Sequence, residues 1–241
     1  MSISIGPDWI EPDTFPTLHA EEVHVWLAVR PAEVEAAGLL KLLSPDERER
    51  AGRFHFEKDR TAFVAARARL RQLLGRYLPT APEKIQFTTN AHGKPELPTP
   101  APIQFNLSHS GDLAVFAFTR AGRVGVDVEQ ARPDFATDPL AERFFAPDEI
   151  KALRALPVAA QPAAFFGCWT RKEAFVKAHG AGLSLGLETF VVSVDGPARL
   201  LSVEGDAANH WTLHDLQPAA GYAGAVAVEA AHGALRKLRW S

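Results

Sequence analysis

Two acidic residues, Asp127 and Glu129, lie one residue apart in the otherwise apolar segment VGVDVE at 124–129. The β-branched residues of this segment predict a strand, and residues two apart in a strand share a face. Like charges so close together repel each other, and a partly buried carboxylate needs a partner. We therefore expect a cation to lie against this pair.

A third acid, Glu173, lies in the segment AAFFGCWTRKEAFVKAHGAGL at 163–183, for which we expect a helix closed by glycines. Its spacing from Phe166 and Trp169 places Glu173 on or beside the apolar stripe of that helix. Lys177, one turn later, is a candidate ion-pair partner, and a metal ion is the alternative. Three carboxylates without a His or Cys cluster suit a hard cation such as Mg²⁺, which usually also binds water and phosphate.

The segment FNLSHSGD at 105–112 contains a hydroxyl next to an imidazole. In an extended chain Ser108 and His109 point apart, so they cannot form a catalytic dyad, and no glycine precedes the serine by two residues as in a nucleophile elbow. The pair fits phosphate contacts at a strand end, or else a turn whose side chains satisfy backbone groups. Lys94, in the loop GKP at 93–95, is a further phosphate-binding candidate, with a surface lysine as the alternative.

Charge is unevenly distributed along the chain, although the formal net charge is only −3 and argues against a nucleic-acid partner. Between residues 48 and 76 nine basic residues outnumber three acidic ones. Such a region attracts phosphates or an acidic partner, or forms a solvated helix face. The basic residues are Arg48, Arg50, Arg53, Lys58, Arg60, Arg67, Arg69, Arg71 and Arg76.

These residues must be positioned by elements that the sequence pattern predicts in two similar series. We expect strands at 21–29, 84–90, 103–120 (a hairpin turning at 110–112), 124–129, 188–194, 211–216 and 222–230. We expect helices at 32–43, 44–54 (Ser44 as N-cap), 59–78, 139–156 and 163–183. Both series run through a strand, a helix with an Arg-Phe pair, a long helix and further strands. We therefore predict an α+β fold of duplicated α/β subdomains, residues 1–120 and 121–241, with a ligand cleft between them.

The remaining composition indicates a globular protein of 241 residues, without an apolar run of membrane-spanning length and without a secretory signal at the N-terminus. The single cysteine, Cys168, excludes an internal disulfide and a multi-cysteine zinc site, and we expect it in the core. We expect a cytoplasmic protein with no membrane or nucleic-acid partner.

The segments GKP, FNLSHSG, GVDVE and WTRKEAFVKAHGAGL, in that order, resemble the 4′-phosphopantetheinyl transferases of the Sfp type. The resemblance runs from about Leu43 to Val228. It implies a pseudo-dimeric α+β fold and the transfer of phosphopantetheine from coenzyme A to a carrier-protein serine, with release of 3′,5′-ADP. It also implies dependence on Mg²⁺, for which Mn²⁺ is an alternative.

The resemblance also implies roles for individual residues. Glu173 and Lys177 are the expected catalytic residues, with Glu173, or a metal-bound water beside it, as the base and Lys177 against the pyrophosphate. Relatives often have a basic residue where this chain has Glu47, and neighbouring arginines are close enough to compensate. The expected metal ligands are Asp127, Glu129 and Glu173, and the expected coenzyme A contacts are Arg50, Arg60, Lys94, Ser108, His109 and Lys177.

The expected partner is an acyl or peptidyl carrier protein of fatty acid, polyketide or nonribosomal peptide synthesis, with an acidic helical surface. We expect it to dock on Phe144, Phe145 and the edge at 180–184, and we expect the enzyme to be a monomer. Two other classes use similar residues: a Mg²⁺-dependent phosphohydrolase with water as nucleophile, and a non-catalytic coenzyme-A-binding regulator.

Overall fold

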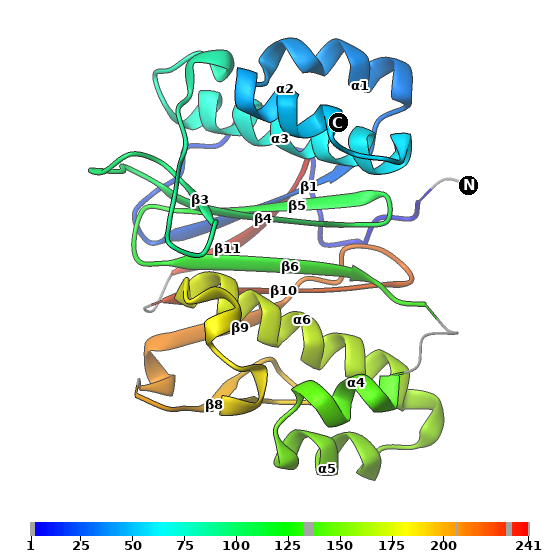
Figure 1. Ribbon diagram of the computed structural model, residues 1–241. Coiled ribbons are helices and arrows are strands. Elements are labelled where there is room, and N and C mark those ends of the chain that lie inside the picture. The colour runs from blue at the N-terminus through cyan, green and yellow to red at the C-terminus, as the bar shows by residue number, and fades with distance from the viewer. Residues whose placement is uncertain (1–2, 133–136, 206, 230–232, 241) are drawn as a thin grey trace.

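The computed structural model describes residues 3–132, 137–205, 207–229 and 233–240 (Figure 1). The fold is α+β, with two central sheets between two groups of helices. The first sheet has the strand order β11-β1-β5-β4 and the second β6-β10-β9. Helix α3 covers the first sheet, with α1 and α2 packed against it, and α6 covers the second, with α4 and α5 packed against it (Figure 1). None of the described helices is long and apolar enough to cross a membrane.

The first series of elements is β1 (Glu22–Val29), α1 (Glu33–Leu39), α2 (Pro45–Gly52), α3 (Glu57–Tyr77), β2 (Thr88–Thr89), β3 (Pro95–Glu96), β4 (Gln104–Ser110) and β5 (Leu113–Thr119). The second is β6 (Val124–Gln130), α4 (Thr137–Phe144), α5 (Pro147–Ala155), α6 (Gln161–His179), β7 (Phe190–Val192), β8 (Leu200–Val203), β9 (Trp211–Asp215), β10 (Tyr222–Glu229) and β11 (Ala234–Trp240). Most predicted elements are therefore confirmed, including the turn at 110–112 and the helix closed by Gly180, whose φ of 84° is left-handed.

The core forms three apolar layers, because each sheet is covered on both faces. Val25 and Val115 of the first sheet pack against Val126 of the second. On the outer face of the first sheet, Trp26 and Phe116 pack with the apolar residues of α3. The alternation expected for β1 therefore describes only one of its faces, since the side chains of the other face are buried under α3.

The structure differs from the prediction in three respects. The strand expected at 84–90 is reduced to the two residues of β2. The helix expected at 139–156 is divided at Ala146, because the residue before Pro147 is extended, with φ −65° and ψ 152°. Strands β3, β8 and β11 were not predicted.

Strand β11, the last described strand, lies beside β1, the first. It pairs with β1 in parallel, with Val23 opposite Leu235 and Trp26 opposite Leu238. The last described strand thus belongs to the sheet of the first series, although it follows the elements of the second. A division of the chain near residue 120 leaves this strand with the other half.

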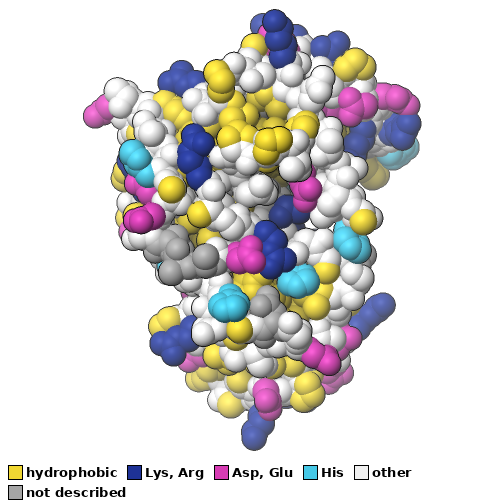
Figure 2. Space-filling model, turned by 90° about the vertical axis from the view of Figure 1, so that its left-hand side faces the viewer, with side chains coloured by type: hydrophobic (Ala, Val, Ile, Leu, Met, Phe, Trp, Pro, Cys, Tyr) yellow, Lys and Arg dark blue, Asp and Glu magenta, His cyan; other side chains and the backbone are white. Residues whose placement is uncertain are grey.

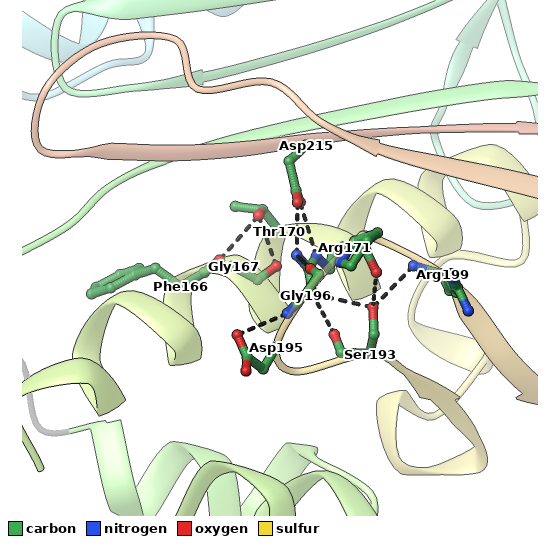
Figure 3. Close-up of polar contacts among 10 residues, drawn as sticks. Phe166, Gly167, Thr170, Arg171, Ser193, Asp195, Gly196, Arg199 and Asp215 are labelled. Carbon is green, nitrogen blue, oxygen red and sulfur yellow. Dashed lines mark hydrogen bonds and ion pairs between the residues drawn. The ribbon is translucent and has the colours of Figure 1, made fainter. Parts of the chain in front are cut away.

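A closed polar network joins α6 to the segment that follows β7 (Figure 3). Arg171 is 5% exposed, and each of its five N–H groups donates a hydrogen bond. The acceptors are both carboxylate oxygens of Asp215, the carbonyl and hydroxyl oxygens of Ser193, and the carbonyl oxygen of Gly196. Every donor of Arg171 is therefore used within the protein.

Candidate active site

Gly125 allows α6 to lie directly against β6. A Cβ atom at this position would be 2.2 Å from the carbonyl oxygen of Ala174 and 2.3 Å from the backbone nitrogen of Ala178. Both atoms belong to the backbone of α6, so no side-chain rotation relieves the contact. The glycine of the GVDVE segment therefore brings Glu173 and Lys177, on the helix, close to Asp127 on the strand.

Asp127 is the most buried of the three predicted metal ligands, at 2% exposure. Its Oδ1 atom accepts hydrogen bonds from Lys177 Nζ at 2.6 Å and from Ser108 Oγ at 2.8 Å. Lys177 also donates to Ser108 at 3.1 Å. The lysine thus pairs with Asp127, whereas the sequence left Glu173 as its candidate partner. Asp127 Oδ2 is buried and accepts no hydrogen bond within the described part of the chain.

The other two acids, Glu129 and Glu173, are partly buried, and their pKa values are raised. Burial raises the pKa of Glu129, and the nearby charge of Asp127 raises it further. Burial likewise raises the pKa of Glu173, with contributions from Asp127 and Glu129, while Lys177 lowers it. The three carboxylates therefore repel one another in a poorly solvated region.

A hard divalent cation suits this donor set, because all three side chains supply oxygen and Asp127 Oδ2 has no partner. Added positive charge would also offset the repulsion that raises the two glutamate pKa values. The described side chains do not include three Asp, Glu, His or Cys residues already converged as a metal-binding group. The assignment of Asp127, Glu129 and Glu173 as ligands stays a prediction.

Lys94 is held by the two elements that carry the acids. Its Nζ atom donates to the carbonyl oxygens of Lys177 at 2.8 Å and of Val124 at 3.2 Å. Burial lowers its pKa to about 8. Lys94, Glu173 and Lys177 line one cavity of about 320 Å³. The loop lysine is thus a partly buried cation at the predicted site rather than a surface lysine.

Ser108 and His109 point apart, as expected for neighbours in a strand. Ser108 faces Asp127, whereas His109 lines a larger cavity of about 530 Å³ together with Glu129, Lys58 and Trp169. Burial lowers the pKa of His109, and the charge of Lys177 lowers it further. The imidazole is therefore poorly placed to carry a proton unless an anion lies beside it.

The two predicted arginines lie away from the three acids in the contacts that the structure describes. Arg50 stacks over the ring of Phe63, 5.2 Å from its centroid. Arg60 forms an ion pair with Glu57 at 3.0 Å. Neither lines the cavity that contains His109 and Glu129, which includes Lys58 instead. Their role toward coenzyme A stays a prediction.

Glu47, the departure from the family pattern, has a structural role. It is 4% exposed and forms ion pairs with Arg67 at 2.6 Å and Arg71 at 2.7 Å. It also accepts a hydrogen bond from the backbone nitrogen of Ser44 at 3.0 Å, which completes the cap of α2. This acid joins α2 to α3 and does not face the cavities described here.

One docking prediction is wrong. Phe145 is 2% exposed and stacks on Phe165, with ring centroids 5.1 Å apart, so it is a core residue that a partner cannot reach. Phe144 is partly buried against Trp169, with ring centroids 5.6 Å apart. Cys168 is fully buried in the same core, as expected.

Sequence reasoning missed three residues at this site: Lys58, Ser110 and Arg132. Lys58 and Arg132 line the larger cavity. Ser110 donates a hydrogen bond to Glu129 Oε2 at 2.8 Å. Its spacing could have indicated this contact, since Ser108 and Ser110 are two apart on one strand, as are Asp127 and Glu129 on another.

Both halves of the chain match models of one known protein family. Residues 123–227 match the 4′-phosphopantetheinyl transferase superfamily, and residues 27–120 match the N-terminal region of 4′-phosphopantetheinyl transferases. The 4′-phosphopantetheinyl transferase HetI of Nostoc sp. is 37% identical over 226 residues, which cover 91% of this chain and 93% of the relative. The transferase psf-1 of Bacillus pumilus is 37% identical, covering 75% of this chain and 77% of the relative. Sfp of Bacillus subtilis is 30% identical, covering 83% and 88%.

The chain belongs to the 4′-phosphopantetheinyl transferase family. Within that family it is of the Sfp type, and it is a 4′-phosphopantetheinyl transferase enzyme. The family acts with coenzyme A on carrier proteins. The acids at 127, 129 and 173 and the lysines at 94 and 177 all fall within or directly beside the matched regions.

Proposed function

We propose that this enzyme transfers the 4′-phosphopantetheine arm of coenzyme A to a serine of an acyl or peptidyl carrier protein. The apo carrier becomes holo, 3′,5′-ADP leaves, and the reaction requires Mg²⁺ or Mn²⁺. One observation supports this most strongly. Asp127 has a buried oxygen without a partner, beside two carboxylates whose pKa values are raised by burial and mutual repulsion.

Asp127, Glu129 and Glu173 would hold the metal ion. When bound, the ion neutralises charge on the pyrophosphate of coenzyme A. Lys177 would contact the same pyrophosphate, because its amine already lies between Asp127 and Ser108. Coenzyme A phosphates would also be bound by Lys94, Ser108 and His109, with Arg50 and Arg60 near the adenosine 3′-phosphate.

Glu173 would act as the general base. Its carboxylate lines the cavity that also contains Lys177, so it lies where a substrate hydroxyl can reach it. The carrier serine gives its proton to Glu173, and its oxygen bonds to the phosphorus that carries the pantetheine arm. The bond from that phosphorus to the bridging oxygen breaks. Lys177 then offsets the charge on 3′,5′-ADP as it leaves.

We also propose that the two halves, residues 1–120 and 121–241, are duplicated α/β subdomains in a pseudo-dimeric arrangement. Each contributes a sheet and a long helix, α3 and α6, on the outer face of that sheet. The two family regions, 27–120 and 123–227, meet at the same place. Strand β11 departs from the division, because it completes the first sheet.

The carrier partner would present an acidic helix, and the enzyme would act as a monomer. Side chains of both signs are interspersed over the face shown in Figure 2. The basic residues Lys58 and Arg132 line the larger cavity and would favour an acidic partner at its mouth. A cytoplasmic location stays the prediction made from the sequence.

Mass spectrometry of apo carrier proteins tests the proposal. Incubation with enzyme, coenzyme A and Mg²⁺ should add one phosphopantetheine arm to the carrier serine and form 3′,5′-ADP. Asp127→Ala should abolish the mass shift, and Glu204→Ala, at an exposed turn, should not. Cleavage of coenzyme A without a carrier would instead indicate a phosphohydrolase. Coenzyme A binding without any product would indicate a regulator.

A further inference from the structure

Strands β4 and β6 meet between the two halves, although they belong to different sheets. Side chains of β4 make the contact, at every second residue. Asn106 Oδ1 accepts from the backbone nitrogen of Val126 at 2.9 Å, and Ser108 Oγ donates to Asp127 at 2.8 Å. Ser110 Oγ donates to Glu129 Oε2 at 2.8 Å. The first half therefore supplies a hydroxyl to each of the two acids on β6.

The two acids depend on these hydroxyls to different degrees. Asp127 also receives a hydrogen bond and a charge from Lys177 at 2.6 Å, so its orientation does not rest on Ser108 alone. Among the described residues, Ser110 is the only hydrogen-bond donor to the carboxylate of Glu129. Removing Ser110 would free the Glu129 carboxylate to rotate, whereas removing Ser108 would leave Asp127 held by the lysine.

The hydroxyl of Ser110 has a fixed direction. It accepts a hydrogen bond from the backbone nitrogen of Gln130 at 3.1 Å. Because a hydroxyl has a single hydrogen, and the Gln130 donor occupies a lone pair, that hydrogen is left for Glu129. The following Gly111 has φ 57°, and a Cβ there would lie 2.5 Å from Gln130 Oε1 and from Tyr222 Oη. The turn therefore holds Ser110 in place.

We propose that Ser110 is a positioning residue, which orients the carboxylate of Glu129 toward the metal ion of the transfer reaction. The inference rests on the proposed function, since it assumes that Glu129 is a metal ligand. Groups that hold metal ligands in this way commonly contribute about 10-fold or more to metal affinity. Ser110 donates its hydrogen to the acid, so its effect should appear in metal binding.

The test measures Mn²⁺ affinity by electron paramagnetic resonance of the free ion, with coenzyme A present and no carrier. Ser110→Ala should weaken Mn²⁺ binding about 10-fold. Ser110→Thr, which keeps the hydroxyl, should stay within about 3-fold of the wild type. Ser202→Ala, at an exposed hydroxyl on β8, is the matched control and should change nothing. Transfer assays should show the same pattern in the metal concentration required, with near-normal kcat at saturating metal.

Wild-type affinity in a folded Ser110→Ala variant overturns the positioning role and leaves the proposed function standing. Equal losses in the Ala and Thr variants also overturn it, since they indicate a packing effect rather than a hydroxyl contact. A wild-type enzyme that neither binds Mn²⁺ nor transfers phosphopantetheine overturns the proposed function, and this inference with it.

Discussion

Helix α6 carries two groups of buried charges that differ in one respect. Arg171 uses all five of its donors within the protein and Lys172 two of its three, whereas Glu173, the next residue, has no hydrogen-bond partner for its side chain among the described residues. Lys172 and Glu149 are both fully buried, 2.6 Å apart. Glu149 also accepts from the backbone nitrogens of Val192 at 2.7 Å and Ala146 at 2.8 Å. On the other face of the helix, the carboxylates near Glu173 repel one another.

This difference separates structural charges from those available to a ligand. A buried ion pair whose charges already neutralise each other gains little from an added ion. A group of carboxylates with raised pKa values and an oxygen without a partner gains charge compensation when a cation binds. The following variants test whether the two groups behave in these opposite ways.

The largest expected effect is on catalysis. Glu173→Gln should lower the rate of phosphopantetheine transfer about 10³-fold, because it removes both the base and a metal-binding charge. The midpoint of thermal unfolding should stay the same or rise, since one of three repelling carboxylates is lost. Transfer rates and calorimetry measure the two effects. A large loss of stability would instead show that Glu173 stabilises the fold, as Lys172 and Glu149 are expected to do.

The buried ion pair of Lys172 and Glu149 should affect stability rather than catalysis. Lys172→Met leaves Glu149 buried without its cation, and should lower the free energy of unfolding by about 3 kcal/mol or more. Where the variant is folded, kcat should stay close to that of the wild type. Denaturant unfolding measures the loss. The double variant Glu149→Gln, Lys172→Met is the control, and should recover part of the stability because no unpaired charge remains.

Both groups of charges lie on α6, and Gly125 determines how closely this helix approaches β6. Gly125→Ala should lower the free energy of unfolding by about 1–3 kcal/mol, because the added methyl group meets the backbone of α6. Transfer activity should fall with it, since Glu173 and Lys177 move with the helix. Gly167→Ala is the matched control, because a Cβ there meets no atom within 4 Å. This control should be neutral or stabilise the helix by up to about 1 kcal/mol.

The smallest expected effect concerns Lys94. Its amine donates to backbone carbonyl oxygens, whereas the amine of Lys172 forms an ion pair with the carboxylate of Glu149. The lowered pKa of Lys94, about 8, means that it loses its charge as the pH rises through that value. Coenzyme A binding should therefore weaken by about 5-fold between pH 7 and pH 9, the loss of one charge contact of about 1 kcal/mol. Calorimetric titration measures this. Lys94→Arg should bind equally at both pH values, and a wild-type affinity that does not change with pH would remove Lys94 from the phosphate contacts.

Much of the fold followed from local patterns. Strand periodicity located β1, β5, β6 and β10, and the Ser44-Pro45 start and the Gly180 end located two helices. The segments that failed depend on distant partners. Residues 84–90 have a strand composition, but pair only over Thr88 and Thr89 with β3. Strand β11, in contrast, contains three basic residues, and its pairing with β1 supplies what its composition does not indicate.

The site was predictable to the extent that spacing along one element fixes it. The alternation of Asp127 and Glu129, and the opposite directions of Ser108 and His109, follow from strand geometry. The pairing of Lys177 with Asp127 could not be read from the sequence, because it depends on how closely α6 approaches β6. The burial of Phe145 was missed for a similar reason, since it depends on the position of Phe165 in α6.

The parallel pairing of β1 with β11 has a consequence for biosynthesis. Strand β1 is translated well before its neighbour β11, because the other described strands and helices all lie between them in the chain. The first sheet therefore keeps the β1 edge unpaired until β11 has emerged from the ribosome. A chaperone that shields this edge on the nascent chain would act during that interval.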